Sequence, residues 1–116
     1  MSNLKEQVQH IVNTLENGIT YADAGMEIDA EANGYESDDI MSGFDYLTDL
    51  LDIEYILGSE KQYLGARILV AFGGPNIWIN TRTQQVEGYW WEESCIMGYS
   101  SDEMDVDGAA QELFNC

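Results

Sequence analysis

One run of strand-forming residues near the middle of the chain narrows the possible folds more than any other stretch of the sequence. Residues 63–72 include five consecutive apolar residues, 68–72, so a strand formed here has two apolar faces. A strand of this kind is typical of the inside of a sheet that other elements cover. The sequence Gly-Gly-Pro-Asn at 73–76 ends it. We therefore expect a sheet around residues 63–72 and helices to cover it.

Strand patterns also lie on both sides of this run. Residues 53–57 are predicted to form a strand that ends in a turn at 58–61. Residues 77–81 and 85–91 flank a three-residue connection, which predicts a hairpin. The sequence thus predicts about four consecutive strands that pair in antiparallel fashion.

Helical periodicity precedes and follows these strands. From Leu4 to Leu15, apolar residues recur at the spacing of one helix face, and Gly18 suits a left-handed C-cap. A second helix is predicted to begin after Ser42, with Asp45 in its first turn. Residues 19–41 lack a clear period, so we expect a mostly irregular, solvated acidic segment with a short helix or strand in it.

A last helix is predicted near the C-terminus, with Asp105 or Asp107 as its cap. The predicted order is helix, helix, four strands, helix. Runs of helices and runs of strands indicate an α+β fold with helices on one face of an antiparallel sheet. The length of 116 residues fits a single domain, 1–116.

The excess of acidic over basic residues limits the kinds of partner that this chain can bind. The chain has 22 acidic and 4 basic residues, a formal net charge of -18. Residues 6–60 contain 14 acids and residues 83–116 contain 8, and neither stretch contains a Lys or Arg. Such a chain is a poor ligand for nucleic acid or for anionic membranes. No apolar run approaches the roughly 20 residues of a membrane span, and no secretory signal is recognisable.

We find no constellation that predicts catalysis, a metal or a cofactor. The single histidine, His10, and the two cysteines, Cys95 and Cys116, are too few for a zinc site, and we expect free thiols. Residues 29–34 and 103–108 resemble the start of a calcium-binding loop. Each lacks the glutamate that closes such a loop six residues further on. The chain is therefore expected not to be an enzyme.

The candidate binding residues are carboxylates and a tyrosine. Asp45, Asp49 and Asp52 are spaced i, i+4, i+7, which on a helix predicts an acidic stripe with steps of about 6 Å and 4.5 Å. Glu36, Asp38 and Asp39 are a second acidic group. Tyr46 is the predicted aromatic anchor. Three further aromatic residues are alternative anchors: Tyr35, Phe44 and Trp91.

The charge is comparable with that of DNA. Duplex DNA carries one charge per about 1.7 Å, so the net charge of this chain matches about 31 Å of duplex. A domain of this length has a diameter near ~35 Å. We therefore hypothesise that the acids imitate DNA and occupy the basic channel of a nucleic-acid-binding protein, with aromatic anchors adding affinity.

In size, charge and lack of catalytic motifs, the chain resembles the small acidic inhibitors of phages and plasmids, namely anti-CRISPR proteins and antirestriction DNA mimics. The resemblance implies a non-enzymatic inhibitor in the bacterial cytoplasm that acts on a basic effector or nucleoprotein and has no direct contact with nucleic acid or membrane. Two alternatives stay open. One is an immunity protein or antitoxin against a basic nuclease toxin, and the other is a solvated acidic domain of a salt-adapted proteome. A homodimer is also compatible with the sequence.

Overall fold

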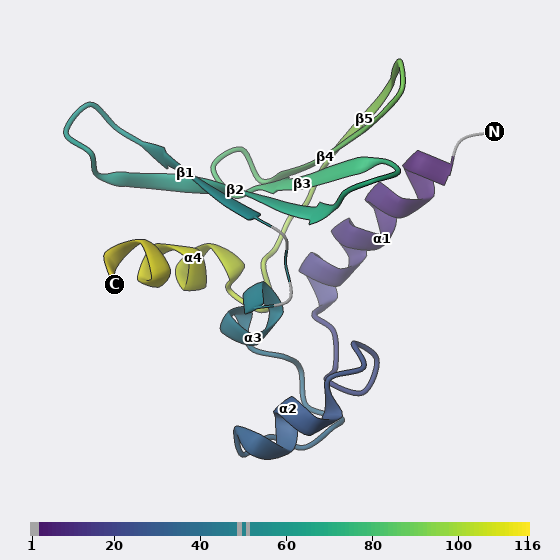
Figure 1. The fold of residues 1–116 in the computed structure, drawn as a ribbon, viewed down its shortest axis with the longest axis vertical. Helices are drawn as coiled ribbons and strands as arrows, with labels where there is room; N and C mark the ends of the chain where they lie inside the picture. The colour runs from purple at the N-terminus through teal and green to yellow at the C-terminus, as the bar shows by residue number, and fades with distance from the viewer. Residues whose placement is uncertain (1–2, 49, 51) are drawn as a thin grey trace.

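The computed structural model describes residues 3–48, 50 and 52–116. The chain has an α+β fold, as the sequence predicts: helices, then an antiparallel sheet, then a C-terminal helix (Figure 1). The elements are, in order, α1 (Asn3–Asn17), α2 (Glu27–Ala32), α3 (Gly43–Thr48), β1 (Asp52–Leu57), β2 (Tyr63–Ala71), β3 (Asn76–Asn80), β4 (Gln85–Trp90), β5 (Glu93–Gly98) and α4 (Val106–Asn115).

The strands form one sheet in the order β1-β2-β3-β4-β5, and every neighbouring pair is antiparallel. The register aligns one apolar row across all five strands. This row consists of Ile53, Ile68, Ile79, Val86 and Met97. Because residues that are directly opposite each other point to the same face, this row defines the side of the sheet that faces the core.

The sheet has five strands, whereas the sequence predicted about four. The prediction missed β5, because residues 85–91 were predicted as the last strand and no strand was predicted after them. In the structure only Trp91 and Glu92 separate β4 from β5. Trp91 has a φ of 57°, in the left-handed region that usually selects glycine in such a turn. Without a glycine signal, the sequence does not show this hairpin.

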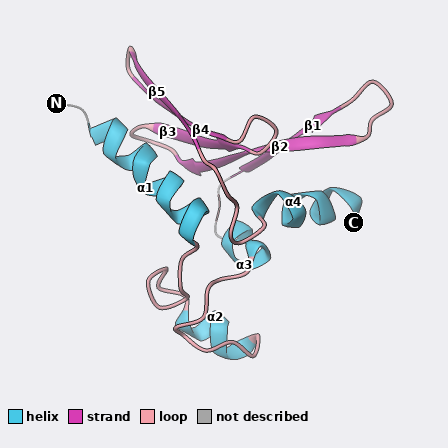
Figure 2. Cartoon of the chain, turned by 180° about the vertical axis from the view of Figure 1, so that it is seen from behind, coloured by secondary structure: helices cyan, strands magenta, loops and turns pink. Residues whose placement is uncertain are grey.

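All the helices lie on one side of the sheet (Figure 2). Helix α1 packs against β4 and β5, and α4 packs against β2 and α3. Gly88 of β4 allows α1 to come close, because a Cβ there would lie 2.5 Å from Val8 and 2.8 Å from Leu4. The largest fully buried side chains are Leu4, Val8, Leu15, Tyr21, Ile68, Ile77, Ile79, Val86 and Val106.

The predicted helix ends are confirmed. Gly18 follows α1 with a φ of 77°, and its N–H donates to the carbonyl of Thr14 at 2.8 Å. The Ser42 hydroxyl accepts from the N–H of Asp45 at 3.1 Å and so begins α3. At α4, the Asp105 carboxylate accepts from the N–H of Gly108 at 3.2 Å. Among the described helices, none is long and apolar enough to cross a membrane.

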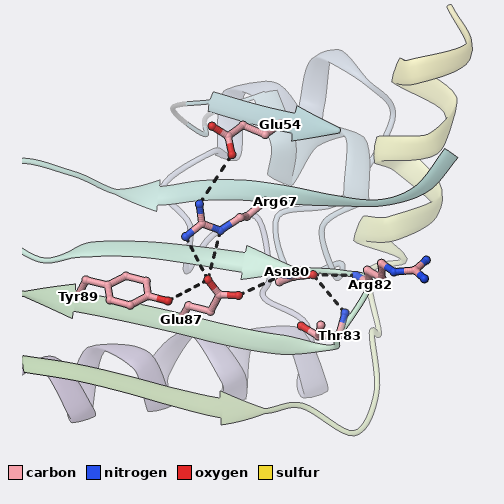
Figure 3. A network of polar contacts seen from close by, with 7 residues as sticks. All are labelled: Glu54, Arg67, Asn80, Arg82, Thr83, Glu87 and Tyr89. Atoms are coloured by element: carbon pink, nitrogen blue, oxygen red, sulfur yellow. Dashed lines mark hydrogen bonds and ion pairs between the residues drawn. The ribbon is translucent and has the colours of Figure 1, made fainter. Parts of the chain in front are cut away.

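The second face of the sheet has no described helix over it, and its centre is a polar network (Figure 3). Arg67 lies 3.1 Å from Glu87 and 3.7 Å from Glu54, and its guanidinium lies 4.2 Å from the centre of the Trp78 ring. Asn80 also donates to Glu87, at 3.2 Å. The ion pairs among the described residues all involve Arg67. The sheet thus balances part of its own negative charge.

Candidate acidic interface

The segment between α1 and α3, residues 19–41, forms a lobe at the end of the molecule opposite the sheet (Figure 1). We call it the acidic lobe. Its two ends pair with each other, since Thr20 and Ile40 form an isolated bridge and the N–H of Met41 donates to Ile19 at 2.8 Å. The segment agrees with the prediction of a mostly irregular stretch that contains a short helix, which is α2, and it has in addition a small apolar interior that the sequence did not predict.

Short turns and three buried side chains hold this lobe together. The Thr20 hydroxyl accepts from the N–H of Asp23 at 3.1 Å and so caps a turn. Tyr21, Met26 and Ala30 are buried. The rings of Tyr21 and Tyr35 stack with their centres 5.2 Å apart. These three side chains thus point inward, whereas Ile28 is 85% exposed and the carboxylates of the lobe point to solvent.

The hydroxyl of Tyr21 connects the lobe to α3. It donates to the Asp45 carboxylate at 2.6 Å and accepts from the N–H of Ser42 at 3.3 Å. The amide of Asn33, at the end of α2, lies 3.5 Å from the same carboxylate oxygen. Burial of the Tyr21 ring and its bond to Asp45 raise the pKa of the hydroxyl. Asp45 is therefore a structural acceptor between lobe and helix.

All seven carboxylates of the lobe are exposed, and the lobe has no Lys or Arg to balance them. They are Asp23, Glu27, Asp29, Glu31, Glu36, Asp38 and Asp39. Glu27 and Glu31 lie one turn apart on α2, a spacing at which like charges destabilise a helix. A shallow depression of the surface is lined by Glu27, Glu31, Gly34, Tyr35, Glu36 and Ser37. This depression combines three carboxylates with Tyr35, a residue that is 42% exposed.

The predicted stripe of Asp45, Asp49 and Asp52 does not exist as a helix face. Helix α3 ends at Thr48, and Asp52 is the first residue of β1, where its carboxylate accepts from the N–H of Ile53 at 2.9 Å. Asp49 lies outside the described residues. The helix is short because Ile53 must enter the core-facing row of the sheet, opposite Ile68. The i, i+4, i+7 pattern therefore spans two elements.

The other predicted residues fall into two groups. Glu36, Asp38 and Asp39 are exposed together on the lobe, where Asp39 accepts from the N–H of Glu36 at 2.8 Å. Tyr46 is 8% exposed, and its burial raises the pKa of its hydroxyl to about 12. Tyr46 is therefore part of the core and cannot be the exposed anchor that the sequence suggested.

Exposed aromatic side chains occur elsewhere. Tyr35 belongs to the acidic depression, and Phe44 of α3 is 41% exposed. Trp91 is 90% exposed at the β4–β5 turn, and Phe72 is 72% exposed after β2. The sequence suggested Trp91 as an anchor but not Phe72. Both follow strands that run in the same direction, so they lie at the same end of the sheet.

Sequence reasoning also missed Glu27 and Glu31 as candidate binding residues. Their i, i+4 spacing was available as a signal, but the segment was not expected to contain a defined helix at these positions. The calcium-like stretch 29–34 has the geometry of the end of α2 and its turn. Among the described residues, no group of His, Cys, Asp and Glu is arranged to hold a metal ion. Cys95 and Cys116 are free thiols.

Comparisons of the chain with protein-family models, curated proteins and solved structures found no match.

Proposed function

We propose that this chain is a non-enzymatic inhibitor that covers the basic nucleic-acid-binding surface of a bacterial defence effector, in the manner of a DNA mimic. The acidic lobe carries the proposal: seven exposed carboxylates lie on one protruding segment that contains no base. Crowded like charges oppose compact folding. A surface that accepts this cost without local cations is best explained by a cationic partner.

The charge distribution supports a directed surface rather than uniform solubility. The sheet pairs Arg67 with Glu54 and Glu87, whereas the lobe projects its charges into solvent. At physiological ionic strength the Debye length is about 8 Å, so neighbouring carboxylates of the lobe act together on an approaching partner. We expect fast association that slows as salt is added.

The acidic depression gives the proposal a specific contact. An Arg or Lys side chain of the partner that enters between Glu27, Glu31 and Glu36 meets three carboxylates. It also meets the face of Tyr35, which can add a cation–π interaction. In such an interface the effector loses access to DNA because the same basic side chains can contact only one of the two ligands.

The test uses the immobilised chain to isolate a bacterial DNA-binding effector by salt-gradient elution, followed by a competition assay. Binding of a fluorescent DNA duplex to that effector is measured by anisotropy as this chain is added. We expect the chain to displace DNA, and we expect the displacement to weaken with salt. A captured effector that binds DNA equally well in the presence of the chain would contradict the DNA-mimic proposal.

A matched pair of triple variants locates the surface. Glu27→Gln, Glu31→Gln and Glu36→Gln together remove three charges from the depression. The control removes three exposed charges elsewhere, in Glu60→Gln, Glu92→Gln and Glu112→Gln. We expect the lobe variant to lose at least about tenfold in affinity and the control to lose much less. Equal losses would mean that net charge alone drives binding.

The immunity-protein alternative differs in its target. It predicts a single basic nuclease toxin as the captured protein and protection of cells that express that toxin. A salt-adapted domain predicts no specific capture at any salt concentration. The isolation experiment therefore separates the three functions.

A further inference from the structure

The outer edge of β5 differs from the outer edge of β1. Both strands have a neighbour on one side only. Edge strands expose unpaired backbone groups, and proteins protect them with charges, proline or bulges. Strand β1 carries Asp52 and Glu54, and its register shifts between Ile56 and Leu57. After Glu93, β5 contains no charge, no proline and no register shift over residues 94–98.

From this asymmetry we propose that β5 pairs with β5 of a second copy of this chain, so that two sheets join into one continuous antiparallel sheet. This inference stands independently of the proposed function. The two-fold axis lies perpendicular to the sheet, because this orientation keeps the helices of both copies on the same side. Cys95 and Met97 then remain on the helix-covered face, and Ser94 and Ile96 remain on the open face.

The parity of the strand and the overlap of the two edges together limit the register to two arrangements. Residues opposite each other in a sheet point to the same face, so the axis passes through a residue, and the greatest overlap of residues 93–98 places it at Cys95 or at Ile96. In the first arrangement Glu93 faces Met97 of the second copy, and in the second it faces Tyr99. Neither arrangement places two like charges opposite each other. In β1, by contrast, an axis through Glu54 would place this carboxylate opposite its own copy.

Helix α1 supplies the second layer of this interface and favours a second copy over an isolated foreign strand. It contacts β4 and β5 to the same extent. Because strands lie about 4.8 Å apart, two such helices related by the axis lie about 10 Å apart. That is close to the usual distance between packed helices. A second copy therefore fills both the strand edge and the space beside α1.

The charge of the chain sets how this association depends on salt. Each copy carries a net charge of -18, so the copies repel each other over long distances. The acidic lobe, however, lies at the end of the molecule away from the sheet (Figure 1). Added salt screens the repulsion and leaves the backbone hydrogen bonds intact. The dimer consequently becomes tighter as NaCl increases, opposite to the behaviour of a contact between unlike charges.

Sedimentation equilibrium of the full chain tests this proposal over a range of protein and NaCl concentrations. We expect a monomer–dimer equilibrium that shifts toward dimer with salt. Ile96 is 52% exposed, and Ile96→Glu introduces facing or neighbouring negative charges, which should weaken the dimer at least about tenfold. The matched control is Leu57→Glu on β1, where Leu57 is 43% exposed, and we expect a change within about twofold. Circular dichroism of both variants confirms that they fold.

A disulfide assay tests the register, because Cα atoms of residues facing each other across the axis are about 4.5–5.5 Å apart, within disulfide range. Both variants carry Cys116→Ser. If the axis passes through Cys95, mild oxidation should link Cys95 of the two copies. If it passes through Ile96, oxidation should instead link the two copies of a variant that carries Ile96→Cys and Cys95→Ser. Glu54→Cys with Cys95→Ser is the negative control. A monomer at all salt concentrations overturns the proposal. So does equal weakening by Ile96→Glu and Leu57→Glu, or a dimer that forms neither disulfide.

Discussion

The hydroxyl of Tyr21 offers the most direct test of how the acidic lobe is held. Tyr21→Phe removes the donor to Asp45 at 2.6 Å and the acceptor for the N–H of Ser42 at 3.3 Å. The ring, which is fully buried, stays in place. A hydrogen bond to a charged group contributes about 1.5–3 kcal/mol, and the longer bond adds less. We therefore expect the free energy of unfolding to fall by about 2–3 kcal/mol.

For a chain of this size, that loss corresponds to a decrease in Tm of about 10 °C. Urea unfolding followed by circular dichroism gives the free energy, and Tyr55→Phe on the exposed β1 is the control, with an expected change below about 0.5 kcal/mol. Asp45→Asn and the double variant complete a double-mutant cycle. If the two substitutions were additive, or if Tyr21→Phe were as stable as the natural chain, the proposed connection would be wrong.

The same substitution has a signature in alkaline solution. The pKa of Tyr21 is raised in the folded chain by burial and by the bond to Asp45. A group of this kind stabilises the fold fully below its unfolded pKa of about 10, and this contribution is lost as the pH rises through the folded pKa. Tyr21→Phe should therefore reduce the loss of stability above pH ~10. An unchanged alkaline profile would argue against a buried, bonded hydroxyl.

Three other perturbations have defined outcomes. Trp91→Gly should raise the free energy of unfolding by about 1 kcal/mol in urea titrations, because the φ of 57° strains any residue but glycine. A decrease would show that the Trp91 side chain stabilises the turn. Arg67→Gln should lower the free energy of unfolding by about 1–2 kcal/mol, because Glu87, whose side chain is only 12% exposed, loses its cation. An unchanged value would show that the network of Figure 3 does not stabilise the fold. The Tm measured by calorimetry should increase between about 20 mM and 200 mM NaCl because screening reduces repulsion among the acids, and a flat or falling Tm would contradict that repulsion.

Local patterns in the sequence predict most of the fold. The apolar stripe of α1, the glycine at position 18 and the serine at position 42 each have a direct structural counterpart. The strands β1 to β4 follow from alternation and from the turns between them. Strand β5 could not be predicted in this way, because Trp91 occupies a turn position normally marked by glycine. The pairing with β4 sets the register of β5, and the residues of β5 alone do not predict this pairing.

The candidate site was harder to predict because spacing alone does not determine the element that carries it. Asp45 and Asp52 have helical spacing, but α3 ends between them. Tyr46 and Tyr35 are both tyrosines next to acids, yet one is in the core and the other is 42% exposed. This difference comes from tertiary packing, since Tyr46 lies on α3, which packs against α4, and belongs to the hydrophobic core. Glu36, Asp38 and Asp39 were predicted to be solvated, and the structure confirms that all three are exposed.

The meeting of Thr20 with Ile40 has a consequence for how this protein can change over evolutionary time. A segment whose two ends touch behaves as an insertion, since its length and composition can vary while the flanking chain keeps its path. None of the strands in the described part of the chain contains a residue of this insertion. We therefore expect mutations that add, remove or relocate acids there to leave strand pairing unchanged, so that the surface of the lobe can diverge while the sheet and its helices keep their structure.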